Sequence, residues 1–260
     1  MRHISYSELK NWVTCPFYHK LTYIDKIKVF AGNEYTAFGT ALHETCEKTM
    51  LKETKDPAGF FLEAFARQIE AISDVEMSQE MITSMEEQGY TLAPLAIPAL
   101  KEYFGEDFAI VSLEEELYET ISECKDVDFN FKGFIDLVVK TPDGKYHIID
   151  WKTCSWGWDS RRKSDRMTTY QLTLYKHFWA KKRGVDVDDI ETHFALLKRT
   201  AKSNRVELFR VTSGKRKTDN AINLLTKAVY NIDKSNFIKN KTSCVGRFGP
   251  CDFYKTEHCP

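Results

Sequence analysis

Apolar residues recur every three or four positions through the first hundred residues of the chain, the spacing that lines one face of a helix. This spacing is found in the segments 5–15, 35–52, 57–72 and 93–104. Ser5 or Ser7 suits the N-cap of the first helix, and Pro57 suits the first turn of the third. Pro94 stands near the start of the fourth segment, and Pro98 predicts an early kink there. The pattern predicts a helical N-terminal part.

From about residue 110 the apolar positions alternate, which is typical of strands with one buried face. Strands are predicted at 109–121, 129–140, 145–153, 191–200 and 205–212. The Thr-Pro-Asp-Gly sequence at 141–144 predicts a tight turn and therefore an antiparallel hairpin. Helical spacing returns at 167–184, which Gly184 is suited to end, and at 218–234. The second part of the chain is therefore predicted to be α/β.

The composition favours a folded protein with a sizeable core. The chain has 260 residues, 42% of them hydrophobic, and shows neither a long uncharged apolar run nor a charged-then-apolar leader. We therefore expect a cytoplasmic protein without a membrane partner. A single domain is predicted, with a helical part at 1–105, an α/β core at 106–235 and a cysteine-rich segment at 236–260.

Charge is distributed unevenly along the chain, although the formal net charge is only −1. Residues 1–130 carry 11 Lys and Arg against 24 Asp and Glu, whereas residues 131–260 carry 26 against 14. The basic second half is the part expected to face an anionic partner. Helices whose charges serve solubility alone would give the same totals, so this alternative stays open.

The predicted hairpin places three charged residues in apolar strands. Asp136 stands within Gly-Phe-Ile-Asp-Leu-Val-Val, where an ionised carboxylate is costly to bury without a partner. Asp150 ends the opposing apolar run, and Lys152 follows on the same face. Two carboxylates at one sheet end suit Mg²⁺ or Mn²⁺, ions that polarise a phosphodiester and activate water, with Lys152 assisting. The alternative is a salt bridge from Lys152 to an aspartate that holds the hairpin together.

The hairpin and the helix after it resemble the PD-(D/E)XK nuclease superfamily, and in particular its RecB-type branch. The hairpin matches the acid, then acid-x-Lys pattern, with Asp150-Trp151-Lys152 as the DXK element. The sequence Thr-Thr-Tyr-Gln-Leu-Thr-Leu-Tyr resembles the Gln-x-x-x-Tyr signature of the branch, here Gln171 and Tyr175. A hydrogen-bonded packing pair on one helix face is the alternative interpretation of these last two residues.

Two upstream segments extend the resemblance. Phe-Gly-Thr-Ala-Leu-His-Glu resembles the upstream histidine motif of the branch, here His43, and the Cys-Pro of the opening segment is similar to the start of that branch. The four matches together cover the chain from about residue 5 to 259. The resemblance implies a restriction-endonuclease-like α/β core, a central mixed sheet flanked by helices, with a helical N-terminal region and a C-terminal cysteine cluster.

The resemblance also implies an activity and a ligand set. The residues implied to hold Mg²⁺ or Mn²⁺ are His43, Asp136, Asp150 and Trp151, the last through its carbonyl. The residues implied to serve catalysis are Asp136, Asp150, Lys152, Gln171 and Tyr175. We expect a single-strand DNA exonuclease that acts in DNA end processing, replication, repair or recombination. Its expected partners are helicase or recombination proteins. It is expected in the cytoplasm or at the nucleoid, either as a cellular protein or as a phage protein in the host cytoplasm. The alternatives are a structure-selective endonuclease and a non-catalytic DNA-end-binding subunit.

Cysteines form a second group. Four of the seven lie near the chain ends, at Cys15, Cys244, Cys251 and Cys259. A subset of the RecB-type branch, which includes CRISPR-associated exonucleases and helicase-nuclease subunits, is similar in holding a 4Fe–4S cluster with one N-terminal and three C-terminal cysteines. The close Cys-x-x-Cys pair usual in that subset is missing here. The alternatives are zinc in a Cys₄ site, with His258 as a substitute ligand, and no bound group at all. The remaining cysteines are expected to be ordinary buried thiols.

A basic and aromatic segment follows the DXK strand. Its residues suited to stacking bases and holding phosphates are Trp156, Trp158, Arg161, Arg162, Lys163 and Arg166. We expect this segment to bind single-stranded DNA without reading its sequence. A soluble loop with partly packed tryptophans is the alternative.

Overall fold

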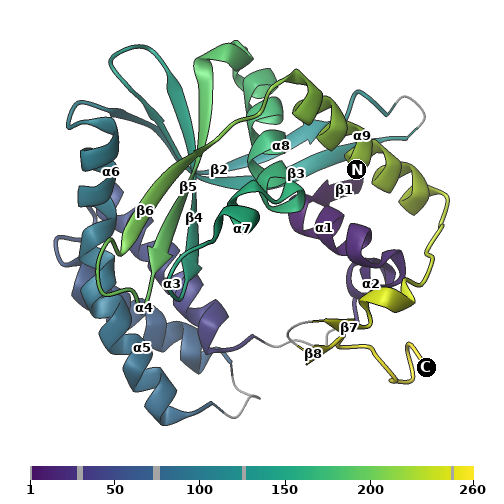
Figure 1. Ribbon diagram of the computed structural model, residues 1–260, viewed down its shortest axis with the longest axis horizontal. Coiled ribbons are helices and arrows are strands. Elements are labelled where there is room, and N and C mark those ends of the chain that lie inside the picture. Colours follow the sequence, from purple (N-terminus) through teal and green to yellow (C-terminus); the bar gives the residue numbers. More distant parts are fainter. Residues whose placement is uncertain (1, 28–31, 73–76, 125–126, 247–248) are drawn as a thin grey trace. The chain divides into compact units, whose positions relative to one another are not determined.

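Figure 1 shows the computed structural model, in which residues 2–27, 32–72, 77–124, 127–246 and 249–260 are described. The chain forms two compact units whose segments alternate along the sequence. Unit 1 comprises Met1–Phe30, Glu116–Gly133 and Ser213–Pro260, and unit 2 comprises Ala31–Glu115 and Phe134–Thr212. This division does not follow the three consecutive parts predicted from the sequence, and the single domain stays a prediction.

The strands form a central six-stranded mixed sheet. They are β1 (Arg2–Ser5), β2 (Ala109–Thr120), β3 (Phe129–Lys140), β4 (Tyr146–Cys154), β5 (Ile190–Lys198) and β6 (Val206–Val211). Their order is β1-β3-β4-β5-β6, and β2 also pairs with β3. The pairs β3–β4 and β5–β6 are antiparallel, whereas β1–β3 and β4–β5 are parallel. The five predicted strands and the antiparallel hairpin are confirmed, whereas β1 was not predicted.

The turn of the hairpin follows from its sequence. The N–H of Thr141 donates to the carbonyl of Lys145 at 3.0 Å, and the N–H of Gly144 donates to the carbonyl of Thr141 at 2.9 Å. Gly144 has a φ of 89°, a conformation that costs glycine little and other residues much. The Pro-Asp-Gly turn therefore fixes the register in which Leu137 lies opposite Ile149.

Helices cover both faces of the sheet in unit 2 (Figure 1). The helices on one face are α3 (Glu34–Met50), α4 (Pro57–Glu70), α5 (Gln79–Leu92) and α6 (Ala96–Phe104), with the 3-10 turn η2 (Ala93–Leu95) before the last. The other face is covered by α8 (Arg166–Arg183), and two short elements flank this helix, α7 (Ser160–Ser164) and the 3-10 turn η3 (Val187–Asp189). The expected arrangement of a mixed sheet between helices is confirmed.

The core of unit 2 is built from the alternating residues of the strands and an aromatic group on the helices. Phe38, Phe61 and Phe65 pack with ring centroids 5.1 to 5.9 Å apart and are almost fully buried. Gly89 of α5 lies against this group, and a Cβ atom there would meet the Phe61 ring at 1.9 Å. Since α5 can approach α4 only without a side chain at that position, Gly89 sets the distance between the two helices.

One helix was not predicted. The polar segment that becomes α5 was missed because only Met85, Gly89 and Leu92 are buried along it and its apolar face is narrow. Pro98 stands in the first turn of α6, directly after the 3-10 turn η2, where its missing N–H costs no helical hydrogen bond, and the kink there stays a prediction. The predicted cap at Ser5 is confirmed: its Oγ accepts the N–H of Glu8 at 3.1 Å.

Unit 1 joins the two ends of the chain. Its helices are α1 (Tyr6–Thr14), α2 (Pro16–His19), the π-helical turn η1 (Lys20–Ile24), α9 (Lys215–Asp233) and the 3-10 turn η4 (Lys241–Ser243). A short hairpin of β7 (Val245–Gly246) and β8 (Gly249–Pro250) follows. Arg2 pairs with Asp233 at 2.5 Å, and the Tyr18 hydroxyl donates to Asp252 at 3.1 Å, so N-terminal and C-terminal segments are bound directly. None of the described helices has both the length and the apolar run needed to cross a membrane.

A buried ionic network fastens β2 to α8. The carboxylate of Glu115, whose side chain is 7% exposed, accepts hydrogen bonds from Ser112 Oγ at 2.6 Å and Trp179 Nε1 at 2.9 Å. Arg183 Nη2 lies 2.9 Å and Lys182 Nζ 3.0 Å from the same carboxylate. Burial alone would raise the pKa of Glu115, but the bonds from Arg183, Ser112, Trp179 and Lys182 outweigh it and lower the pKa to about 2.

We expect Glu115→Gln to lower the free energy of unfolding by about 2 to 3 kcal/mol at pH 7. Because the folded-state pKa is depressed, this stabilisation is present above the unfolded pKa of about 4.3 and is lost as the pH falls towards 2. Urea unfolding at pH 7 and pH 3 should therefore show a smaller difference between the two proteins at pH 3. The control is Glu116→Gln, a half-exposed side chain whose loss should cost less than about 1 kcal/mol. Equal effects of the two substitutions would contradict this role of Glu115.

Candidate functional site

Asp136 lies where strands β3 and β4 separate. Beyond the Leu137–Ile149 pair, the N–H of Trp151 donates not to a strand carbonyl but to the Asp136 side chain, with 2.7 Å between nitrogen and Oδ2. The Asp136 side chain is 12% exposed. Trp151 is buried in the core on the face of β4 that is covered by α3 to α6. The carboxylate therefore replaces a ladder partner and is held rigidly at the sheet end.

Asp150 lies on the opposite face of β4 from Trp151 and is almost fully buried. Its Oδ1 accepts a hydrogen bond from Gln171 Nε2 of α8 at 2.7 Å, and Lys152 Nζ lies 2.7 Å from its Oδ2. Gln171 Nε2 also donates to the Tyr175 hydroxyl at 3.3 Å. Apart from the ion pair with Lys152, Oδ2 has no hydrogen-bond partner among the described residues. One carboxylate oxygen is thus fixed by α8, and the other is available to a cation.

His43 approaches the carboxylates from α3. Its Nδ1 lies 3.6 Å from Asp136 Oδ2, and its side chain is 30% exposed. One turn earlier, Gly39 of α3 faces β4, where a Cβ atom would lie 3.4 Å from Thr153 Oγ1. Helix α3 therefore passes close to β4 at this point, which brings His43 to the carboxylates.

The charges of this group shift each other's ionisation. Burial raises the pKa of Asp150 to about 6, and the charge of Asp136 adds to this, against the attraction of Lys152. Burial would also raise the pKa of Asp136, but His43, Lys152 and the Trp151 N–H hold it below its usual range. Burial would lower the pKa of His43, but the charge of Asp136 raises it. Two neighbouring carboxylates with opposite shifts are typical of a functional site.

Glu114 of β2 is a further acid near this group. Burial, and then the negative charges of Asp136, Glu47 and Asp150, raise its pKa to about 7. Its φ of 45° is left-handed, a costly backbone for glutamate, and such strain is found most often at functional sites. The run of three glutamates in a predicted strand was the available signal, but a left-handed residue has no sequence signature here.

The aromatic residues after the DXK strand separate into two environments. Trp156 is 79% exposed, whereas Trp158 is 8% exposed and packs against Phe194 and Phe209 with ring centroids 5.2 and 6.1 Å away. The Arg162 guanidinium lies 4.4 Å above the Trp158 ring. Of the two predicted stacking residues, only Trp156 presents its ring to solvent.

The basic residues of this segment also differ. Lys163 is ion-paired with Glu207 and lies 4.9 Å from the Phe209 ring centroid. Arg161 and Arg166 are exposed on α7 and at the start of α8. The exposed part of the predicted DNA-binding segment therefore consists of Trp156, Arg161, Arg162 and Arg166, of which Arg162 also stacks on the Trp158 ring.

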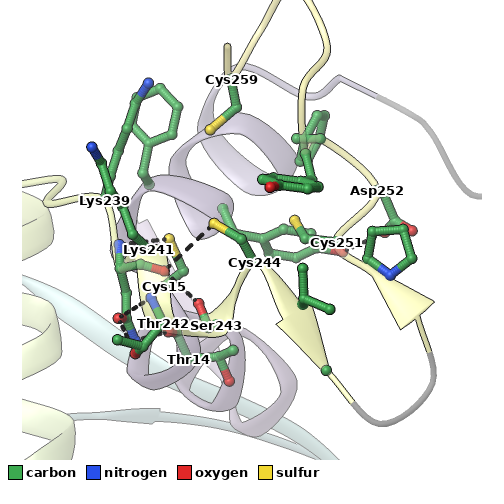
Figure 2. A pocket seen from close by; sticks show the side chains of 18 of the residues that line it. Thr14, Cys15, Lys239, Lys241, Thr242, Ser243, Cys244, Cys251, Asp252 and Cys259 are labelled. Atoms are coloured by element: carbon green, nitrogen blue, oxygen red, sulfur yellow. Dashed lines mark hydrogen bonds between the residues drawn. The ribbon is translucent and has the colours of Figure 1, made fainter.

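The four end cysteines line one cavity of unit 1, with a volume of about 760 Å³ (Figure 2). The N–H of Asn240 donates to Cys15 Sγ at 3.4 Å, and the N–H of Cys251 donates to the carbonyl of Cys244 at 2.8 Å. Burial raises the pKa of Cys251, with smaller contributions from Asp252, Cys244 and Cys15. The structure therefore places the N-terminal thiol and the three C-terminal thiols around one cavity, and the shared centre that the resemblance implies stays a prediction.

The remaining cysteines lie elsewhere. Cys46 is buried, and Cys124 and Cys154 are partly buried. His258, the alternative zinc ligand, is 37% exposed and pairs with Glu257 at 3.6 Å. It is not among the residues that line the cavity in the described part of the chain.

Comparison with known proteins assigns the fold. The crystal structure of a Eubacterium rectale protein named "Putative exonuclease" superposes with a TM-score of 0.59 at 11% identity, covering 98% of this chain and 86% of that one. The structure of SSO0001 has a TM-score of 0.36 at 13% identity, covering 86% and 84%, and this likeness is too weak to carry an argument. No curated protein matches the sequence. The sequence model described as "PD-(D/E)XK nuclease superfamily" matches residues 3–259, and the chain therefore belongs to that superfamily.

Proposed function

We propose that this nuclease is a metal-dependent deoxyribonuclease that acts as an exonuclease on single-stranded DNA ends. The observation that carries the proposal is the convergence of His43, Asp136, Asp150 and Lys152, which come from one helix and two strands and lie within a few ångströms of one another. A salt bridge between Lys152 and Asp150 is present, but it accounts for neither Asp136 nor His43.

The carboxylates fit Mg²⁺ or Mn²⁺. Asp150 Oδ2 is a buried oxygen that has no hydrogen-bond partner among the described residues apart from the Lys152 ammonium, and Asp136 supplies a second fixed carboxylate. Asp136, Asp150, His43 and the Trp151 carbonyl would hold the ion. When bound there, the ion supplies Lewis acidity that polarises the phosphodiester and lowers the pKa of the attacking water.

The side chains around the carboxylates have separate tasks. Gln171 fixes the rotamer of Asp150 through Oδ1, and Tyr175 in turn limits the positions open to the Gln171 amide. Lys152 is 32% exposed and stays protonated, because Asp150 and Asp136 raise its pKa against the effect of burial. Its ammonium can orient the attacking water and stabilise charge that develops on the phosphate.

A direct test is to incubate the purified protein with 5′-labelled and 3′-labelled linear DNA, single-stranded and double-stranded, and with circular single strands, with and without Mn²⁺. We expect stepwise shortening of linear single strands that requires the metal. Cleavage of circles would instead identify an endonuclease, and binding without cleavage a non-catalytic subunit.

We expect Asp136→Asn, Asp150→Asn and Lys152→Ala each to lower kcat by at least about 10³-fold, because each removes several kcal/mol of transition-state stabilisation. DNA affinity and the thermal midpoint should change little, since Asn retains the size of Asp and Lys152 is partly exposed. Asp107→Asn, an exposed acid of the same unit, is the matched control and should cleave normally. Full activity in any of the three site variants would remove that residue from the site.

For the DNA surface, Arg161→Ala combined with Arg166→Ala should weaken binding to single strands of every sequence to the same extent. Each lost phosphate contact should reduce the slope of log K against log salt by about 0.7, so the pair should reduce it by about 1.4. Fluorescence anisotropy between low and moderate salt measures the slope. Lys55→Ala with Lys101→Ala, two exposed lysines outside this segment, should leave it unchanged. An unaltered slope in the arginine variant would place the DNA elsewhere.

We further propose that the cavity in unit 1 holds a 4Fe–4S cluster. Among the described residues, no three of the cysteine sulfurs lie within 4.8 Å of one another. Thiolates on one tetrahedral zinc lie about 3.8 Å apart, because each Zn–S bond is about 2.3 Å long. The wider spacing favours a cluster over zinc, because the four thiolates of a 4Fe–4S centre each bind a different iron.

Protein purified without oxygen should be brown and contain about four irons and four sulfides per chain. Replacing Cys15, Cys244, Cys251 or Cys259 by Ser should bleach it and lower its solubility, because the centre links segments far apart in sequence. Cys46→Ser, Cys124→Ser and Cys154→Ser are the controls and should stay brown. A colourless preparation that contains zinc would support the alternative, and bleaching that spares Cys15 would exclude the link between chain ends.

A further inference from the structure

A second group of ligand atoms lies on strands β4 and β5, on the face that carries α3 to α6. His147 lies opposite Glu191 in the parallel pair, and His193 follows two residues later on β5. His147 Nδ1, His193 Nε2 and one oxygen of Glu191 all lie within 4.8 Å of one another. His147 is 7% and His193 is 1% exposed, so both rings are inside the protein.

The three atoms are spaced as ligands of one small cation. His147 Nδ1 lies 3.1 Å from His193 Nε2, and Glu191 Oε2 lies 3.8 Å from each nitrogen. The point in their plane that is equidistant from all three is about 2.1 Å from each, as these separations require, which matches Zn–N bonds of about 2.0 to 2.1 Å and Zn–O bonds of about 2.0 to 2.2 Å.

The neighbours of His147 fix which ring nitrogen is unprotonated. The Thr141 hydroxyl has one hydrogen, which it donates to the Asp143 carboxylate, a group that can only accept. His147 Nε2, 2.9 Å from the same hydroxyl, must therefore be the donor in that contact. The neutral ring then carries a lone pair at Nδ1, which is the nitrogen near His193 and Glu191. In metal sites a hydrogen bond to one ring nitrogen fixes the tautomer of a histidine ligand in the same way.

Glu191 is fixed in the same way. Arg210 Nη2 of β6 binds its Oε1 at 2.9 Å, which leaves Oε2 for the histidines. Phe104 of α6 packs against both imidazoles, with ring centroids 4.7 Å from His147 and 5.1 Å from His193. A proton shared between the two histidines would satisfy that pair without engaging Glu191 Oε2, which lies 3.8 Å from each nitrogen. A cation satisfies all three atoms.

We propose that His147, His193 and Glu191 bind one divalent transition-metal ion of the zinc class. Two imidazole nitrogens and one carboxylate favour Zn²⁺, Co²⁺ or Ni²⁺ over Mg²⁺, which prefers oxygen. The Glu191 side chain is 23% exposed, so a water molecule can complete the coordination. The ion joins the starts of β4 and β5 and stabilises unit 2.

This site is separate from the one that carries the carboxylates. His147 precedes Asp150 by three residues on β4, about 10 Å along the strand, and an odd spacing places the two side chains on opposite faces. One ion cannot reach both groups. The proposal therefore stands independently of DNA cleavage, and its test needs no nuclease assay.

The experiment compares four full-length proteins after removal of metal by a chelator: the unmodified protein, His193→Gln, Glu191→Gln and the control Glu102→Gln, an exposed glutamate of α6. Equilibrium dialysis against Zn²⁺ in excess Mg²⁺, followed by metal analysis, counts the ions bound. We expect the unmodified protein and Glu102→Gln to bind one more zinc ion per chain than the other two. Ions held by the cysteines or by the carboxylate site are common to all four and cancel.

Affinity and stability give a second measurement. Loss of one ligand should lower the affinity for zinc by roughly 100-fold or more. Even mutation of a residue that only hydrogen-bonds a ligand lowers metal affinity by about 10-fold to 100-fold. Zn²⁺ should raise the thermal midpoint of the unmodified protein and of Glu102→Gln, but not of the ligand variants. If His193→Gln does not fold, Glu191→Gln decides, because it keeps the size of a partly exposed side chain. Equal zinc content and equal thermal shifts in Glu191→Gln and the unmodified protein would overturn the proposal.

Discussion

The bond from the Trp151 N–H to the Asp136 carboxylate is the interaction on which the candidate site depends. It ends the β3–β4 ladder without leaving a buried donor unpaired, and an unpaired donor would cost about 1 to 3 kcal/mol. Because the bond is made to a side chain, the two strands can separate while Asp136 stays fixed. Asp136 therefore has both a structural and a chemical role. Removing its side chain entirely would disturb β4 as well as remove a negative charge from the site.

Successive side chains of strand β4 alternate between the two faces of the sheet, and each face carries a different kind of residue. Ile149 and Trp151 face helices α3 to α6 and belong to the core, and the imidazole of His147 is buried on the same face. Asp150 and Lys152 face α8, from which Gln171 donates a hydrogen bond to Asp150. Because neighbours on a strand point to opposite faces, one nine-residue element serves a hydrophobic core, an acid-base pair and a histidine group.

Much of this arrangement could be predicted from the sequence, because local rules fix it. The Pro-Asp-Gly turn and the alternation predicted the hairpin and the meeting of Asp136 with Asp150. Burial of Trp158 could not be predicted, because it depends on Phe194 and Phe209 from strands that come later in the chain. The cap at Ser5 is local, whereas the left-handed Glu114 and the pairing of His147 with His193 depend on tertiary structure.

The order of segments in unit 1 has a consequence for how the protein is made. The unit takes residues from the start, the middle and the end of the chain, with residues 31–115 and 134–212 between them assigned to unit 2. Ribosomes add about 5 to 20 residues per second, so the first segment waits roughly 10 to 40 s before the last begins to emerge. During that time Leu9 of α1, which is fully buried in the finished protein, lacks the contacts that α1 makes with α9. Unit 2 can be completed first, and until then the first segment of unit 1 needs protection from aggregation.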